Sequence, residues 1–385
     1  MTTEKCGREL IVSSFNLDCA KIRGKINPKT FHNPHCSSYF YSMTDPQPIK
    51  KRRVRYRGTH PRRFEEKYKE LNPQKYTDDV QKVIERGQTP AGTHRPICVN
   101  EIIKVLQLSP GQVGLDATLG YGGHTEQILP KILPRGKLVA IDVDPVELPR
   151  TEKRLRAKGF DSDQLVIKRM NFAGIPQLLT EAPEGFDFVL ADLGVSSMQI
   201  DNPSRGFTFK SHGPLDLRLN PNRGKPASEL IKELNEEELA EMLKDNSDEP
   251  HAIPIARAIH AGRTDINSTS DLKTVIERAM AKHSPNEIKK SLQRVFQALR
   301  IRVNDEFGVL EQFLNLLPSC LKSGGRVAIL TFHSGEDRRV KKIFQKNFRA
   351  GVYSQIAKNP VRPTISERRS NPRSTCAKLR WAVKS

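Results

Sequence analysis

Short apolar segments alternate with helical stretches through the middle of the chain, and this alternation restricts its possible folds more than any other feature. We predict strands over residues 113–119, 137–142, 164–168, 186–192 and 326–332. These segments are apolar at nearly every position, so both faces of each strand should be covered. Apolar strands separated by helices are typical of a parallel sheet with helices on both sides, and the predicted fold class is α/β.

The stretch from residue 209 to residue 291 departs from this alternation, because it contains helical patterns and no convincing strand. Helices are predicted over residues 227–234, 236–244, 253–261 and 270–281. An all-helical block between two α/β stretches indicates an inserted domain over residues 209–291. The domain that contains the sheet is then expected to comprise residues 93–208 and 292–345.

The formal net charge of +20 is concentrated at the two ends of the chain. Residues 1–93 contain 19 basic and 10 acidic side chains and residues 338–385 contain 14 and 1, so the middle is close to neutral. We predict a basic N-terminal extension over residues 50–92 and a basic C-terminal tail over residues 346–385. Both would suit a polyanion such as nucleic acid. The alternative is a basic surface without a specific partner.

Residues 1–49 show no clear periodicity and are predicted to be a disordered or misassigned leader. Acidic residues within it argue against a transit peptide, so a cytoplasmic protein is expected, with an organelle signal as the alternative. The six cysteines lack the spacing of a zinc site, so no metal is expected. No segment reaches the roughly 18 apolar residues of a membrane span, so no membrane is expected either.

A glycine-rich turn, Gly120-Tyr-Gly-Gly123, follows the first predicted strand and precedes a predicted helix. Glycines in such a turn let backbone amides approach a nucleotide-like ligand beside the helix N-terminus. Asp142, at the end of the second strand, is placed to accept hydrogen bonds from both hydroxyls of a ribose. An ordinary tight turn, or a site for NAD, would share the glycine-rich turn, and NAD enzymes also share the acidic residue.

The end of the fourth predicted strand favours a methyltransferase over an NAD enzyme. Asp192-Leu-Gly-Val-Ser-Ser197 lies there, where doubly wound methyltransferases place an acidic or polar loop beside the transferring methyl group. Phe172, just after the third strand, is placed either to flank an adenine ring or to pack in the core. These features together indicate a methyltransferase site at one edge of the sheet.

Further motifs run in a fixed order from residue 94 to the C-terminus. They are His94-x-Pro96, Asp116-Ala-Thr-Leu-Gly-Tyr-Gly-Gly-His-Thr125, Ile141-Asp-Val-Asp-Pro145, Asp192-Leu-Gly-Val-Ser-Ser197, Arg205-Gly-Phe207, Gly213-Pro-Leu-Asp216-x-Arg218, Phe296-Gln-Ala-Leu-Arg300, Phe332-His-Ser334, Glu336-Asp-Arg338 and Asn371-Pro-Arg-Ser374. This set resembles the bacterial 16S ribosomal RNA cytosine-N4 methyltransferases. Two of the motifs, Asp-Leu-Gly-Val-Ser-Ser and Gly-Pro-Leu-Asp, are peculiar to that family.

The resemblance implies a Rossmann-like sheet with a helical insert, and S-adenosylmethionine as cofactor. The residues implied to contact the cofactor are Gly122, Gly123 and His124 at the methionine end, Asp142 at the ribose, Phe172 near the adenine, and Asp192 and Gln199 at the reactive end. The implied reaction is methylation of the exocyclic N4 amine of a decoding-region cytidine. Small-subunit ribosomal RNA, or an assembling small subunit, is the implied partner, and a homodimer remains open.

For catalysis we expect Asp192 to orient the cofactor or the amine, and Ser196 and Ser197 to hold the base. His333 is a second candidate to accept the amine proton, or else a structural residue. Two other functions remain as alternatives. The chain can be a methyltransferase of another nucleic acid or of a protein, or a ribosome assembly factor without catalytic activity.

The chain departs from the family pattern at three places. Asn246-Ser-Asp-Glu249 stands where many members have Tyr-Gly-Glu-Glu, Gly335 replaces a usual leucine, and Cys376 lies in a segment that is usually rich in Arg and Ser. These differences concern the expected RNA contacts and leave the expected cofactor site intact.

Overall fold

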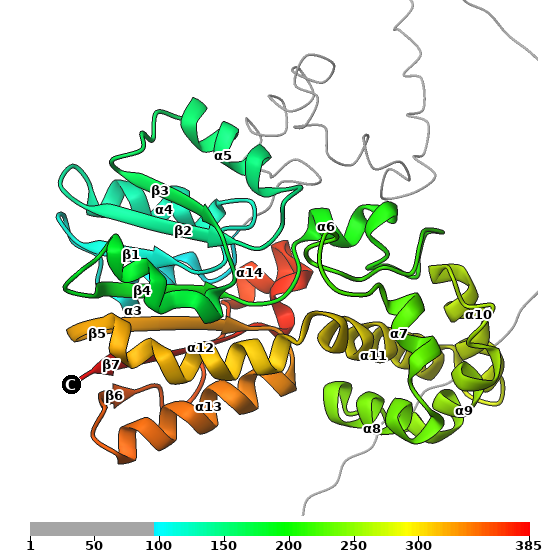
Figure 1. Ribbon diagram of the computed structural model, residues 1–385. Coiled ribbons are helices and arrows are strands. Elements are labelled where there is room, and N and C mark those ends of the chain that lie inside the picture. The colour runs from blue at the N-terminus through cyan, green and yellow to red at the C-terminus, as the bar shows by residue number, and fades with distance from the viewer. Residues whose placement is uncertain (1–95) are drawn as a thin grey trace, which may run out of the picture. The chain divides into compact units, whose positions relative to one another are not determined.

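A single seven-stranded sheet forms the centre of the computed structural model, which describes residues 96–385 (Figure 1). The strand order is β3-β2-β1-β4-β5-β7-β6. The strands are β1 (Val113–Asp116), β2 (Lys137–Asp142), β3 (Leu165–Arg169), β4 (Phe186–Asp192), β5 (Leu321–Thr331), β6 (Tyr353–Ile356) and β7 (Lys378–Lys384). The first five are parallel, and β7 pairs antiparallel with both β5 and β6. The predicted α/β fold class is confirmed.

Helices cover both faces of the sheet, as the apolar strands require. On β2, Leu138 and Ala140 join one core cluster, whereas Val139 and Ile141 join the other, which is the alternation of a strand buried on both sides. The first cluster includes side chains of α3 (Val99–Leu106), α4 (Gly123–Ile132) and α5 (Leu148–Ala157). The second includes side chains of η2 (Phe172–Thr180), α12 (Glu306–Cys320) and α13 (Ser334–Arg349).

Helices dominate the chain between β4 and β5, as predicted. Short α6 (Ser197–Asp201) and η3 (Pro203–Arg205) come first, and then α7 (Ala227–Glu233), α8 (Glu236–Ser247), α9 (Ala252–Gly262), α10 (Thr269–Ala279) and α11 (Pro285–Asn304). The helices α7 to α11 share a third core cluster (Figure 1). Side chains of Asn235, Ser268 and Ser284 form capping boxes that fix where α8, α10 and α11 begin.

The predicted end of the insert at residue 291 is wrong. Helix α11 runs without interruption through that position, and its residues Leu292, Val295 and Leu299 belong to the same core cluster as α7 to α10. The insert therefore includes the whole of α11, and the chain returns to the sheet domain with α12.

The predicted basic tail over residues 346–385 is also wrong. This segment contains β6, α14 (Ile365–Ser370), η4 (Pro372–Cys376) and β7, and β7 lies inside the sheet. The buried Arg380 of β7 donates to Asp337 of α13 at 2.6 Å, and Lys378 donates to the same carboxylate at 2.9 Å. These pairs neutralise the cations, which allows a basic segment to form an internal strand of the sheet.

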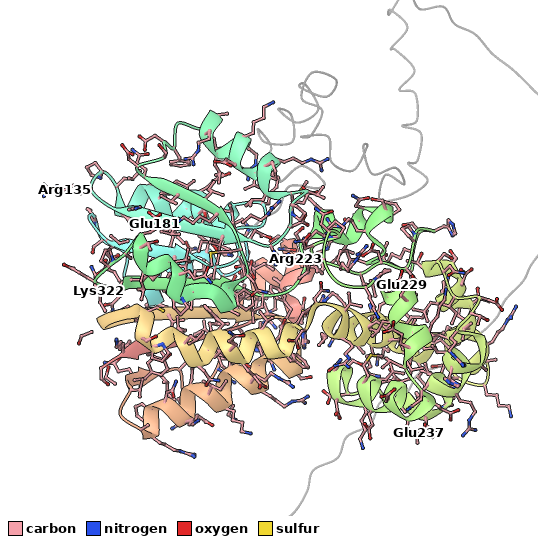
Figure 2. All side chains as sticks on the ribbon, in the orientation of Figure 1. Arg135, Glu181, Arg223, Glu229, Glu237 and Lys322 are labelled. Atoms are coloured by element: carbon pink, nitrogen blue, oxygen red, sulfur yellow. The ribbon has the colours of Figure 1, made fainter. Side chains whose placement is uncertain are left out.

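Charged side chains cover the outside of both parts of the fold. In Figure 2, Arg223, Glu229 and Glu237 lie on the surface of the insert, and Lys322 lies at the opposite end of the sheet domain. Within residues 96–385, no helix is both long and apolar enough to cross a bilayer. The predicted leader and basic extension, residues 1–92, lie outside the described part of the chain.

Candidate functional site

The carboxyl edge of the sheet collects the predicted cofactor residues. Strands β1, β2 and β4 end there with Asp116, Asp142 and Asp192, and the glycine-rich turn leads from β1 into α4. Gly122 is the N-cap of α4 and has a φ of 75°, a conformation that side chains other than glycine rarely adopt. A Cβ at this position would also lie 3.2 Å from the side chain of Thr151. Glycine at this position therefore allows the turn to pack closely against α5.

Asp142 is held by backbone amides on both oxygens. The N–H of Gly120 donates to Oδ2 at 2.7 Å, and the N–H of Asp144 donates to Oδ1 at 2.9 Å. Burial raises the pKa of Asp142 to about 6, although these two hydrogen bonds oppose the shift. Asp142 lines a cavity together with Gly120, Ser196 and Gln199. Since each carboxylate oxygen can accept more than one hydrogen bond, Asp142 can still bind two hydroxyls.

His124 and Asp192 face each other across the same edge. Nε2 of His124 lies 3.4 Å from Oδ2 of Asp192. Both Nε2 of His124 and Oδ1 of Asp192 are buried, and neither has a hydrogen-bond partner within residues 96–385. Buried polar atoms without a partner cost free energy, so a ligand that bonds to them would bind favourably. A zwitterionic ligand such as S-adenosylmethionine carries both donors and acceptors, and it fits this pair and the glycine turn.

Ser196 and Gln199 form a capping box at the start of α6. The hydroxyl of Ser196 accepts from the N–H of Gln199 at 3.2 Å, and Oε1 of Gln199 accepts from the N–H of Ser196 at 2.8 Å. Nε2 of Gln199 donates to Oδ2 of Asp144 at 2.7 Å. The side chain of Gln199 therefore fixes the loop after β4, while both residues remain in the wall of the cavity.

Sequence reasoning missed a buried ion pair between Asp144 and Arg205. Nη1 of Arg205 donates to Oδ2 of Asp144 at 2.8 Å, and both side chains are almost fully buried. Nη2 of Arg205 donates to the backbone carbonyls of Arg218 and Leu219, at 3.1 and 2.9 Å. The guanidinium thus joins the loop after β2 to the segment that leads into the insert. Two matching motifs, Ile141-Asp-Val-Asp-Pro145 and Arg205-Gly-Phe207, contain these residues.

His333 lies near the edge but turns toward its own helix. It is the N-cap of α13, where Nδ1 accepts from the N–H of Glu336 at 3.4 Å and Nε2 lies 3.1 Å from Oε1 of Glu336. Burial alone would raise the pKa of Glu336, but the His333 ring and Arg300 hold it below its usual value. Nε2 of His333, like Oδ1 of Asp192, is buried without a hydrogen-bond partner within residues 96–385, so both residues stay candidates to accept a proton.

Phe172 packs in the core at the start of η2. Its ring centroid lies 5.0 Å from that of Phe313 on α12, and the side chain is only partly buried. Core packing thus accounts for one side of the ring. Its exposed part is available to a flat ligand beyond β3, so the two predicted roles are compatible.

Two of the departures from the family pattern are paired with other residues. A Cβ on Gly335 would lie 2.5 Å from the ring of Phe307, which also contacts the guanidinium of Arg339 at 3.4 Å from the ring centroid. Asp248, at the end of α8, accepts hydrogen bonds from Arg338 and Ser334 of α13. Both departures therefore contribute to packing around α13.

Comparison with known proteins identifies relatives over most of the chain. A family model described as the MraW methylase family matches residues 91–385. The chain is 57% identical to ribosomal RNA small subunit methyltransferase H 2 of Alkaliphilus metalliredigens, over 89% of this chain and 100% of that protein. It is 53% identical to ribosomal RNA small subunit methyltransferase H 1 of Lachnoclostridium phytofermentans, over 88% of this chain and 94% of that protein.

Proposed function

The chain belongs to the MraW methylase family, and from this membership we propose that it uses S-adenosylmethionine to methylate small-subunit ribosomal RNA. The observation that carries the proposal is the pair of buried, unbonded atoms at the carboxyl edge, Nε2 of His124 and Oδ1 of Asp192. Their position beside the glycine turn is where a methyl donor and an acceptor amine have to meet. The substrate class follows from the names of the relatives.

The glycine turn and two strand ends would hold the cofactor. The backbone of Gly122 and Gly123, with His124, would bind the methionine end, and Asp142 would accept hydrogen bonds from the ribose hydroxyls. The exposed part of Phe172 would contact the adenine. Bound S-adenosylmethionine supplies an electrophilic methyl group, which the chain's own side chains cannot provide.

We further propose that the acceptor is the exocyclic N4 amine of a cytidine in the decoding region. Such an amine is a poor nucleophile because its lone pair is delocalised into the ring, so it must be aligned and relieved of a proton. Oδ1 of Asp192 would accept the hydrogen bond that aligns the amine and then the proton that the amine loses. The loop at Ser196 and Ser197 would hold the base, which has to leave its stack to reach the edge.

The decisive experiment maps methylated cytidine in small-subunit RNA by mass spectrometry, from cells with and without this gene. We expect one N4-methylated cytidine to disappear with the gene and to return with the wild-type copy. Complementation with an Asp192→Asn copy should not restore it. An unchanged methylation map would contradict the proposal, and an assembly factor without catalytic activity would then be the better description.

A parallel assay separates the remaining alternative, a methyltransferase of another substrate class. Purified protein and labelled cofactor are incubated with small-subunit RNA, part-assembled small subunits, duplex DNA or a protein mixture. We expect label only in the RNA-containing samples. The same proposal places the enzyme in the cytoplasm, where its substrate is assembled.

A further inference from the structure

A polar groove between α3 and α14 lies next to the candidate active site and has no role in the proposed chemistry. It is lined by Pro96, Val99, Asn100, Glu101, Thr364, Ser366, Glu367, Ser370 and Asn371. The backbone N–H of Cys98, at the start of α3, donates to Oε1 of Glu367 at 2.9 Å, which ties the two helices together. Figure 1 shows α14 at the carboxyl edge of the sheet, near α6.

The groove shares its inner wall with the cofactor site. A Cβ on Gly123 of the glycine turn would lie 3.2 Å from Cδ of Pro96. His124, the next residue after Gly123, lies 3.4 Å from Asp192, so this wall leads to the proposed proton acceptor. On the other side, Arg373 of η4 donates to Asp201 of α6 at 3.2 Å. A nucleotide in the groove would therefore be close to one held at Asp192.

The groove itself is suited to a base and not to a phosphate. The sulfur of Cys98 and one carboxylate oxygen from each of Glu101 and Glu367 lie within 4.8 Å of one another. Two carboxylates so close together repel a phosphate, and they accept hydrogen bonds from an exocyclic amine, as Glu and Asp do from cytosine N4. Asn and Ser side chains in the wall can bond the remaining edge of a base or a ribose.

The helix α14, which lines the groove, also carries two exposed arginines. Helix α14 has no buried residue, and its Arg368 and Arg369 are exposed next to the lining residues Glu367 and Ser370. An RNA strand that placed one base between the carboxylates would carry its phosphates past these arginines. Carboxylates in the groove and arginines on the same helix thus suit a nucleotide with an amino-bearing base.

We propose that the α3–α14 groove binds the nucleotide adjacent to the target, and that it selects cytosine, adenine or guanine over uracil. Glu101 and Glu367 accept from the exocyclic amine, and Arg368 and Arg369 bind the flanking phosphates. This inference rests on the proposed function, because it assumes that RNA reaches Asp192. It adds a second nucleotide site, which fixes the register of the strand.

The first test measures binding of short single-stranded RNAs to the full-length protein with S-adenosylmethionine present. The RNAs carry the target cytidine and have either cytidine or uridine at each adjacent position. Wild type should bind the cytidine form about tenfold more tightly at one of the two positions. Glu101→Gln should remove that preference, whereas Glu241→Gln, an exposed residue on α8, should retain it. No preference in wild type, or a preference unchanged in Glu101→Gln, would overturn the base site.

The second test separates the phosphate contacts from general electrostatic attraction. Arg368→Ala/Arg369→Ala is compared with Lys341→Ala/Lys342→Ala, which removes the same charge from exposed positions on α13. The arginine variant should flatten the slope of log affinity against log salt by up to about 1.4, since each phosphate contact contributes about 0.7 for single strands. An equal loss in both variants would contradict a specific role for α14.

The two proposals fail in different ways. If wild type binds RNA with the predicted base preference and yet transfers no methyl group to small-subunit RNA, the proposed function is wrong and the groove is retained as an RNA site. If wild type methylates the RNA and Glu101→Gln binds all the RNAs as wild type does, the groove proposal alone is wrong.

Discussion

At the carboxyl edge of the sheet Asp142 is half-buried and its pKa is raised to about 6, whereas toward the amino edge the pKa of Glu181 is lowered to about 2. The cause of the second shift is hydrogen bonding by Lys137 and Lys168, each at 2.7 Å from Glu181. Asp187, at the start of β4, likewise accepts from the N–H of Val113 at 2.7 Å.

Carboxylates therefore have different roles at the two edges of the sheet. Toward the amino edge both carboxylates have lysine partners, since Lys322 lies 3.2 Å from Asp187, and these pairs stabilise the folded chain. At the carboxyl edge Asp142 has only backbone partners, and one oxygen of Asp192 has none within residues 96–385. Partly buried carboxylates without a lysine or arginine partner are typical of sites that bind or transform a ligand. The predictions below test this difference, with matched changes at the two edges.

The largest effect is expected for Asp192→Asn at the carboxyl end of β4. Loss of the proton acceptor should lower the rate of methyl transfer by about a hundredfold to ten-thousandfold, with a folded protein. Asp187→Asn, at the other end of the same strand, should leave the rate close to wild type. Single-turnover transfer to small-subunit RNA measures both, and a similar rate in the two variants would remove Asp192 from the chemistry.

The second prediction concerns cofactor affinity. Asp142→Ala should weaken binding of S-adenosylmethionine by about 1.5–3 kcal/mol, the usual contribution of a hydrogen bond to a charged group. Titration calorimetry of the folded variant provides the measurement. Glu181→Ala removes a carboxylate from the other end of the sheet and should leave the affinity unchanged, so equal losses in both variants would point to a general loss of structure.

The raised pKa of Asp142 leads to a third prediction, on how cofactor affinity depends on pH. Ribose hydroxyls donate to the carboxylate form, so affinity should fall as the pH decreases below about 6, at most about tenfold per pH unit. In Asp142→Asn the affinity should be weaker and its dependence on pH between 5 and 7 should be lost. A pH profile shared by both proteins would assign the titration to another group.

Local patterns were sufficient to predict the five parallel strands of the sheet. The fourth strand was predicted over residues 186–192, which are the bounds of β4, because an uninterrupted apolar run ends there at an acid. The helices α7 to α10 were predicted to within three residues, also from local patterns. Their apolar periodicity, and polar caps such as Asn235 and Ser268, are contained in a few consecutive residues.

What was missed depends on partners distant in sequence. In the sequence alone, Arg380 predicts a surface segment. Its partner Asp337 lies 43 residues earlier, and this pairing is what allows β7 to be part of the sheet. The Asp144–Arg205 pair spans 61 residues and has no local pattern. The capping box of Ser196 and Gln199, in contrast, follows the Ser-x-x-Gln spacing of a helix start and was available from the sequence.

The smallest effect is expected for Glu181→Gln, on stability alone. The folded-state pKa of about 2 lies below the ordinary value of 4.5, so ionised Glu181 stabilises the fold above pH 4.5. That contribution is lost as the pH falls from 4.5 toward 2. Because both lysine pairs are partly exposed, we expect the variant to lose only about 1 kcal/mol in the free energy of unfolding at pH 7.

Urea unfolding of wild type and Glu181→Gln at pH 7 and pH 4 tests this last expectation. The difference between the two proteins should be present at pH 7 and smaller at pH 4. Asp142→Asn should behave in the opposite sense. The pKa of Asp142 is raised from 3.8 to about 6. In wild type, ionisation of this group therefore destabilises the fold as the pH rises through that interval. The neutral amide of the variant removes this cost. The difference in the free energy of unfolding, variant minus wild type, should therefore be more favourable to the variant at pH 7 than at pH 4. If the free energy of unfolding changed with pH in the same direction for both variants, the carboxylates at the two edges would be equivalent. The carboxyl edge would then not be specialised for a ligand.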